Sequence, residues 1–243
     1  MKIGLYLRTV SYLFVFFAIV IIVIIPTALV ASLPKAWRHR VPCFFWLEHL
    51  IFWLLLKATW VPIKYVGLSN IPQKTPLIFA ANHQSSLDIP LMGRLARGAP
   101  HVWLLWHALT KYPVFGYIMR RMNIIVDTRS PRRAVAAIHQ ASELLKGTKR
   151  HLMICPEGGR YVDGTIHPFF RGFAMVARET HRPVVPVMII NAGKVNPPKT
   201  VLIHYAPITV IIGEPFTYQE GETDREFLAR VHAWFKQHEP TIR

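Results

Sequence analysis

The chain has 243 residues, of which 52% are hydrophobic and 17% are charged, so it can bury enough apolar surface to fold and is not an intrinsically disordered protein. Its 2 cysteines exclude a disulfide framework and a four-cysteine zinc site. A formal net charge of +16 indicates a polyanionic partner, either nucleic acid or an anionic membrane surface.

An uncharged apolar run covers residues 9–34 and follows the cations Lys2 and Arg8. Its 26 residues are enough to cross the hydrocarbon core of a bilayer. Most of the basic excess lies in the same half of the chain, which favours a membrane over nucleic acid as the partner. The run predicts a transmembrane or re-entrant helix, which Pro26 would kink. A cleaved signal peptide is the alternative, and the length of the run disfavours it.

A second apolar stretch, residues 41–62, is rich in aromatic side chains and is interrupted by charge at Glu48 and Lys57. It follows a basic patch that consists of Lys35, Arg38 and Arg40. This composition suits a helix that lies along the membrane surface better than a second span. The alternative is a core helix of the following domain. We therefore predict a membrane anchor at residues 1–62 and an α/β domain at residues 63–243.

From residue 63 onward, short β-type runs alternate with helical segments, which predicts a mixed sheet flanked by helices. The expected strands are residues 64–67, 76–81, 123–127, 151–155, 184–191, 201–205 and 209–213. The expected helices are residues 89–95, 102–109, 132–146, 173–179 and 225–238. Gly147 is a natural stop for the third helix, and Thr223 with Asp224 opens the last one.

The first strand end whose side chains are suited to catalysis carries Asn82, His83 and, five residues after the histidine, Asp88. A histidine just beyond a buried strand, with a carboxylate nearby, can be a general base with its orienting acid. Five residues correspond to about 500° on a helix, so the side chains meet only if His83 lies in the turn and Asp88 in the first helical turn. Ser85 is a suitable N-cap for that helix, which leaves open that Asp88 is only a capping acid.

A second strand end carries Pro156, Glu157, Gly158, Gly159 and Arg160. Glycines let backbone amides approach an anion and Arg160 supplies a planar fork of donors, which is the chemistry of a phosphate-binding loop. A solvent-exposed glycine turn is the alternative. A histidine base and a phosphate loop on consecutive strand ends, joined to a membrane anchor, indicate a reaction on a phospholipid headgroup.

Four motifs in order resemble the 1-acyl-glycerol-3-phosphate acyltransferase family over residues 61–215. They are Asn82, His83 and Asp88; residues 113–116 with 123–129; residues 155–161 with Phe170, Arg171 and Gly172; and Val185, Pro186 and Val187. The first motif and Arg160 match the family, whereas His107 stands where a lysine is common and Tyr161 where the family has serine. The resemblance implies a glycerolipid acyltransferase-like domain.

The resemblance further implies O-acyl transfer from acyl-CoA or acyl carrier protein to the sn-2 hydroxyl of lysophosphatidic acid, giving phosphatidic acid in phospholipid biosynthesis. In that reaction His83 is the general base and Asp88 holds its imidazole in the required tautomer. Residues expected to bind substrate are Asn82, Arg129, Glu157, Gly158 and Arg160. Arg160, with help from Arg129, would pair with the acceptor phosphate, and Glu157 would bind a glycerol hydroxyl. No metal or cofactor is expected.

The expected partners are a bilayer with anionic lipids, lysophosphatidic acid and the acyl donor, with no nucleic acid. We expect the cell inner membrane as the location, with the active site facing the cytoplasm.

Three alternatives stay open. The acceptor can be another lysophospholipid, because His107 and Tyr161 depart from the family near the headgroup. A zinc hydrolase would need a third ligand beside His83 and Asp88, nominally His101, His107 or His139, but no paired-histidine helix motif is present. A membrane-tethered nucleic-acid-binding module would use the basic charge, but lacks the usual binding signatures.

Overall fold

The computed structural model describes residues 2–38, 40–111, 113–127 and 129–240. In these ranges a mixed sheet of seven strands has the order β1-β7-β6-β2-β5-β3-β4. The strands are β1 (Ile63–Val66), β2 (Ile78–Ala81), β3 (His101–Trp106), β4 (Ile124–Val126), β5 (His151–Ile154), β6 (Val184–Ile190) and β7 (Ile208–Ile212). Strands β2, β3, β4, β5 and β6 run parallel to one another, whereas β7 is antiparallel to β6 and pairs with β1 in parallel. The mixed sheet predicted from the sequence is therefore confirmed.

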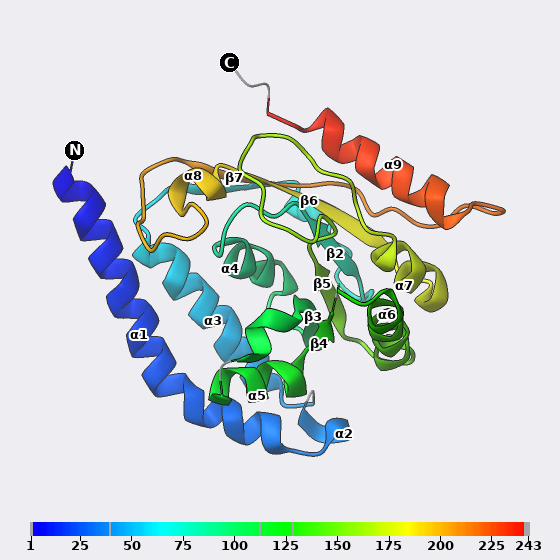
Figure 1. The fold of residues 1–243 in the computed structure, drawn as a ribbon, viewed down its shortest axis with the longest axis horizontal. Coiled ribbons are helices and arrows are strands. Elements are labelled where there is room, and N and C mark those ends of the chain that lie inside the picture. The colour runs from blue at the N-terminus through cyan, green and yellow to red at the C-terminus, as the bar shows by residue number, and fades with distance from the viewer. Residues whose placement is uncertain (1, 39, 112, 128, 241–243) are drawn as a thin grey trace.

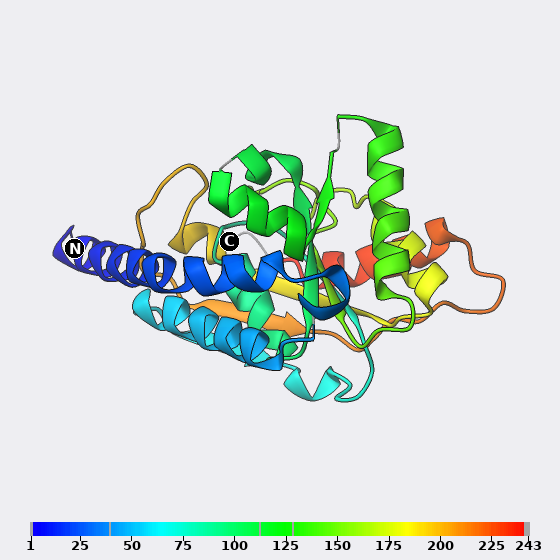
Figure 2. The same ribbon diagram turned by 90° about the horizontal axis from the view of Figure 1, so that it is seen from below.

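Helices cover both faces of this sheet (Figures 1 and 2). The α-helices are α1 (Lys2–Ser32), α2 (Lys35–Arg38), α3 (Pro42–Ala58), α4 (Asp88–Gly93), α5 (Pro113–Met122), α6 (Pro131–Leu145), α7 (Gly172–Thr180), α8 (Ala192–Val195) and α9 (Asp224–Gln237). Three short 3₁₀ helices in the same ranges cover Leu68–Asn70, Arg94–Ala96 and His107–Lys111.

Alternating side chains of β2 separate the core into two layers. Phe79 packs with α3, α4 and α8, whereas Ile78 and Ala80 pack with α6, α7 and α9. This alternation is the ordinary consequence of strand geometry, because successive side chains point to opposite faces. Both layers are apolar, which fits a parallel sheet that is covered on two sides.

Two of the predicted helices begin at the caps that the sequence provides. The Ser130 side chain accepts a hydrogen bond from Arg133 N ahead of α6, and Thr223 forms a capping box with Glu226 ahead of α9. Such caps satisfy backbone donors that have no partner inside the helix. Gly147, at a φ of 64°, follows the end of α6 as expected.

Two predicted elements are wrong. Residues 102–109, expected to be helical, form strand β3 and the start of a 3₁₀ helix, because the run pairs on both sides with β4 and β5. A short, buried apolar run does not distinguish a helix from an inner strand. Residues 201–205, expected as a strand, have no regular secondary structure. Instead, Ile203 N donates to Thr9 Oγ1 of α1 at 3.0 Å.

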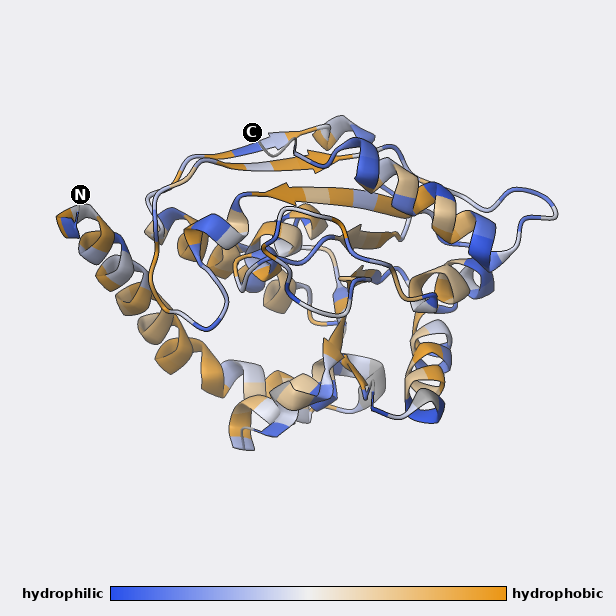
Figure 3. Cartoon of the chain, turned by 45° about the horizontal axis from the view of Figure 1, so that its top comes forward, coloured by the Kyte–Doolittle hydropathy of each residue, from blue (hydrophilic) through white to orange (hydrophobic). Residues whose placement is uncertain are grey.

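The N-terminal helices pack along one side of the domain (Figure 1). Helix α1 continues through Pro26 and is long and apolar enough to cross a membrane, and Figure 3 shows its hydrophobic colouring. Helix α3 buries Phe52 against Gly93 of α4 and exposes Trp46 and Trp53. The second apolar stretch thus combines the two roles considered from the sequence, with one face in the core and the other on the surface.

Candidate active site

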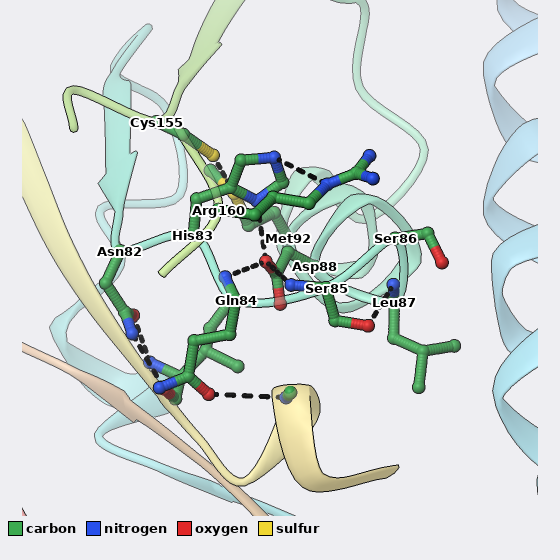
Figure 4. Close-up of polar contacts among 12 residues, drawn as sticks. Asn82, His83, Gln84, Ser85, Ser86, Leu87, Asp88, Met92, Cys155 and Arg160 are labelled. Carbon is green, nitrogen blue, oxygen red and sulfur yellow. Dashed lines mark hydrogen bonds and ion pairs between the residues drawn. The ribbon is translucent and has the colours of Figure 1, made fainter. Parts of the chain in front are cut away.

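The candidate site lies where the neighbouring parallel strands β2 and β5 end. His83 follows β2, and Cys155 to Arg160 follow β5, so the sheet brings together two segments that are far apart in the chain (Figure 4). The carboxyl ends of adjacent strands in an open parallel sheet are a common place for a binding site. The order of the strands changes direction here, since β3 and β5 lie on one side of β2 and β6 on the other.

His83 and Asp88 meet in the geometry that their spacing requires. His83 lies in the turn after β2, Asp88 is the first residue of α4, and His83 Nδ1 lies 2.7 Å from Asp88 Oδ2. Asp88 is fully buried. Because its carboxylate is held away from water, it can fix the orientation of the imidazole ring.

Asp88 also caps the turn that carries His83. Its Oδ2 atom accepts hydrogen bonds from Gln84 N at 2.7 Å and Ser85 N at 2.8 Å. Within the described residues its other oxygen, Oδ1, has no hydrogen-bond partner. Capping and pairing with histidine, which the sequence presented as alternatives, are therefore carried out by the same carboxylate.

The second ring nitrogen of His83 faces an exposed arginine. Arg160 Nε donates to His83 Nε2 at 3.3 Å. A guanidinium group can only donate, so in this network Nε2 is an acceptor and Nδ1 carries the proton that Asp88 accepts. His83 thus presents an unprotonated nitrogen on the open side of the site, which is the tautomer that a general base needs.

The electrostatic environment of His83 favours the protonated ring. Burial lowers the pKa of His83, but the adjacent Cys155 sulfur and the Asp88 carboxylate outweigh burial and raise it to about 10. Figure 4 shows Cys155 beside the ring. The group therefore holds a proton strongly once it has accepted one.

Two of the predicted binding residues hold the backbone of the site. Glu157 is buried, and its two oxygens accept from His83 N at 3.0 Å and His167 N at 3.2 Å. Burial raises the pKa of Glu157, and these two hydrogen bonds partly offset it. Asn82 is buried as well and bonds both backbone groups of Ile189 in β6, at 2.9 and 2.7 Å. Both side chains thus fix the position of the His83 turn.

Gly158 adopts a left-handed turn at a φ of 68°. A Cβ atom at this position would lie 2.4 Å from the Phe170 ring. Glycine is required here by conformation and by space, and the backbone of the loop stays close to the site.

Arg129 is not in contact with His83 in this structure. It lies beyond β4, two strands away from β5, and forms a two-point ion pair with Asp127 at 2.9 and 3.0 Å. The Arg129 guanidinium lowers the pKa of Asp127 well below its usual range. His107, which follows β3, lies 3.7 Å from the same carboxylate.

An apolar cavity of about 480 Å³ adjoins the site on the β3 side. Its walls come from the ends of three strands and from α6 and α7, and include Trp106, Val126, Cys155, Phe170 and Met175. Cys155 and Phe170 belong to the third motif, but the sequence does not predict a cavity here, because an apolar side chain that lines a cavity has the same pattern as one in the core. A cavity of this kind suits an aliphatic chain.

A more polar cavity of about 580 Å³ lies on the other side of the His83 turn, toward β6. Gln84, Asp163, Asn191 and Lys194 are part of its wall. The site is therefore open both toward an apolar space and toward a polar one.

The histidines that could have completed a zinc site lie beside other carboxylates. His101 pairs with Glu48 at 3.4 Å, His107 lies near Asp127, and His139 lies 3.5 Å from Glu179. Among the described residues no three His, Cys, Asp or Glu side chains are grouped so that they could hold a metal ion. The zinc alternative therefore has no third ligand in this part of the chain.

Comparisons with known proteins identify several relatives of this chain. A family model described as Acyltransferase matches residues 62–190. The chain is 30% identical to the 1-acyl-sn-glycerol-3-phosphate acyltransferase of Pseudomonas aeruginosa, over 84% of this chain and 79% of the relative. It is 32% identical to a chloroplast 1-acyl-sn-glycerol-3-phosphate acyltransferase of Brassica napus, but spans only 43% of the length of that protein.

The fold also matches a solved structure. The crystal structure of the 1-acyl-sn-glycerophosphate acyltransferase from Thermotoga maritima superposes with a TM-score of 0.77 and covers 98% of this chain and 95% of its own. At 23% sequence identity this likeness shows that the two proteins share a fold.

Proposed function

Because this chain belongs to the acyltransferase family, we propose that it transfers an acyl group from an acyl thioester to the sn-2 hydroxyl of lysophosphatidic acid. The product is phosphatidic acid. The observation that carries this proposal is the His83 ring, fixed at Nδ1 by a buried carboxylate at 2.7 Å and open at Nε2 toward an exposed arginine. The names of the relatives support the choice of lysophosphatidic acid as the acceptor.

The reaction follows from the accessible nitrogen of His83. Nε2 takes the proton of the acceptor hydroxyl as the hydroxyl oxygen attacks the thioester carbonyl. The tetrahedral intermediate then expels the thiolate, which receives the proton from the imidazolium. Asp88 stabilises the imidazolium between these two steps. No covalent enzyme intermediate, metal or cofactor takes part in this scheme.

Arg160 binds the acceptor phosphate and brings the hydroxyl to His83. In this scheme the hydroxyl takes the place of the Arg160 Nε atom at Nε2, and the released guanidinium pairs with the phosphate through its two-pronged face. Backbone amides around Gly158 lie in the same loop as Arg160 and can approach the phosphate. Arg129 assists once it has released Asp127 and paired with the phosphate. Asn82 and Glu157 act as positioning residues through the backbone hydrogen bonds that they make.

The apolar cavity beside Cys155 holds an acyl chain, and the donor is a thioester of coenzyme A or of acyl carrier protein. The protein works at the cell inner membrane with its site toward the cytoplasm. The apolar helix α1 and the exposed aromatic residues of α3 support membrane association.

A panel of lysolipids, each assayed with both donors, tests the function. We expect phosphatidic acid from lysophosphatidic acid, unchanged turnover in chelator or with added DNA, and a loss of about 100-fold to 10,000-fold for His83→Ala. Preference for another lysophospholipid would favour the alternative acceptor that His107 and Tyr161 leave open, and Tyr161 stacks on His167 beside the site. Near-normal turnover of folded His83→Ala would contradict the mechanism.

A further inference from the structure

A cluster of arginines lies outside the candidate active site, beside α2 and the end of α5. Arg38, Arg120 and Arg121, together with Asn123 and Gln140, line a cavity of about 220 Å³. Two further arginines lie near the cavity, because burial and the neighbouring charges of Arg40 and Arg38 lower the pKa of Arg150. The catalytic scheme uses none of these residues.

The cluster lies at the opposite edge of the sheet from His83. Asn123 directly precedes β4 and Arg150 directly precedes β5, so both mark the amino ends of parallel strands. His83 and Arg160 follow the carboxyl ends. The cluster is therefore separate from the loop that is proposed to bind the acceptor phosphate.

The donors of Arg38, Arg120 and Arg121 contact backbone oxygens and, among the described residues, no carboxylate. Arg121 bonds the carbonyl oxygens of Ala31, Ser32 and Leu33 at the end of α1. Arg120 bonds Thr110 O, and Arg38 bonds Arg121 O at 2.6 Å. Within the described ranges, no ion pair joins any of the five arginines to an acidic side chain.

Arg38 provides the strongest indication that this pocket binds an anion. Only 7% of this residue is exposed, and its Nε atom is buried without a hydrogen-bond partner among the described residues. Burial and the neighbouring Arg121 lower the pKa of Arg38. A buried donor and several like charges are stabilised together when a phosphate group accepts hydrogen bonds from them.

The surroundings indicate that this phosphate belongs to a lipid. The cluster follows directly after the apolar helix α1, and Trp37 beside it is 64% exposed. An apolar groove of about 310 Å³ runs between α1 and α5 and is lined by Ile25, Leu29 and Val114 among others. Cations and tryptophan at the end of an apolar helix are typical of the level of lipid headgroups. A soluble anion or an acidic protein would leave the apolar groove beside the cluster uncovered.

We propose that the pocket of Arg38, Arg120 and Arg121 binds the phosphate of an anionic bilayer phospholipid whose chains lie beside α1. This site anchors the protein in one orientation at the membrane. The proposal concerns binding alone, so it stands or fails independently of the acyl-transfer reaction.

Sedimentation with vesicles tests the site, using phosphatidylcholine alone or mixed with phosphatidylglycerol. Arg120→Gln and Arg38→Gln should each lower partition onto the mixed vesicles about fivefold, since a surface cation contributes about that much. Arg225→Gln removes one exposed positive charge at the start of α9, as Arg120→Gln does at the end of α5, and should have a much smaller effect. Partition onto pure phosphatidylcholine should be the same for all proteins.

Further variants and a competition experiment distinguish lipid binding from binding of other anions and from the effects of misfolding. Arg38→Lys should restore only part of the binding, because lysine lacks the planar donors. If Arg38→Gln shifts the unfolding midpoint, the exposed Arg120→Gln variant decides the question. Equal effects of Arg120→Gln and Arg225→Gln would overturn the site in favour of diffuse attraction. Competition by millimolar inorganic phosphate, or loss of carrier-protein-dependent turnover with normal vesicle binding, would also overturn it.

Discussion

His83 can accept a proton only through Nε2, because Nδ1 is engaged by the buried Asp88. The tautomer is fixed from two sides, by a carboxylate at one nitrogen and by the Arg160 donor at the other. The same carboxylate raises the pKa of the ring, so it improves the base and also makes the neutral form scarcer near neutral pH. The raised pKa therefore makes the rate depend on pH, because only the neutral ring can accept the proton.

We expect the transfer rate to rise as the pH increases from 7 to 9. The base must be neutral to act, and since its folded-state pKa is raised above 6.5, the rate falls as the pH drops through the raised value. Asp88→Asn removes one cause of the raised pKa, so the acidic limb of the pH–rate profile should move to lower pH while the maximum rate falls about 100-fold or more. An unmoved limb in folded Asp88→Asn would show that another group controls the profile.

Arg160 is expected to act on the acceptor rather than on the donor. Arg160→Lys keeps the charge but loses the planar fork, and the loss of one charge-assisted contact costs about 1.5–3 kcal/mol, or roughly tenfold to a hundredfold in kcat/KM for lysophosphatidic acid. Steady-state kinetics with each substrate varied in turn measures this effect. A raised KM for the thioester, with unchanged lysophosphatidic acid kinetics, would place Arg160 at the donor site instead.

The sequence predicts the contact between His83 and Asp88 and places Asn82 and Glu157 in the site, but it does not predict that these two residues act by holding the backbone. His83 and Asp88 are five positions apart, and their contact follows from turn geometry. The bonds of Asn82 go to Ile189, 107 positions further along the chain, so no local pattern could show that its role is to hold the turn. The Glu157 bond to His83 N likewise depends on the pairing of β2 with β5.

At the scale of elements, capping and periodicity predicted α6 and α9, but burial hid the difference between a strand and a helix in β3. Residues 102–106 are apolar without alternation, and β3 lies between β5 and β4 in the sheet. Amphipathic periodicity disappears in such a position. The predicted strand at residues 201–205 is wrong for another reason. The backbone groups of this segment bond to α1 and α8 rather than to a strand.

The packing of α3 on α4 depends on one small residue. A Cβ atom at Gly93 would lie 2.1 Å from the Phe52 ring, and Phe52 is buried. Alanine favours helix by up to about 1 kcal/mol over glycine, but overpacking a core costs about 1–3 kcal/mol, so Gly93→Ala should destabilise the protein. Urea unfolding in detergent measures this change.

A double variant separates this contact from a general effect on α4. In a Phe52→Leu background the ring edge is gone, so Gly93→Ala should cost less than it does in the wild-type chain. The same cost in both backgrounds would mean that α3 does not rest on Gly93. The other buried residues of α3, such as Leu55 and Leu56, would then account for its packing on the domain.

Helix α1 contacts the rest of the domain near both of its ends. Near its start, Thr9 Oγ1 accepts from Ile203 N, and Arg8 Nε donates to Ile203 O at 3.3 Å. Near its end, Ser32 Oγ bonds the Tyr117 hydroxyl at 3.1 Å and Arg121 caps three carbonyls. Between these points the helix exposes a row of apolar side chains, including Phe14, Ile22 and Leu29. To cross a bilayer, α1 would have to release one set of these contacts.

Labelling with a membrane-impermeant maleimide distinguishes an α1 that stays on the domain at both ends from an α1 that crosses the bilayer. In a variant without Cys43 and Cys155, single cysteines replace Lys2, Ile22 or Arg225, and each protein is added to the outside of preformed vesicles. Because the contacts of Arg8 and Thr9 keep the start of α1 on the domain, Lys2→Cys and Arg225→Cys should both react before detergent is added. Ile22→Cys, at an exposed apolar position, should be protected by lipid and serves as the control for membrane insertion. Reaction of Lys2→Cys only after the vesicles are dissolved would show that the N-terminal contacts open and that α1 spans the membrane.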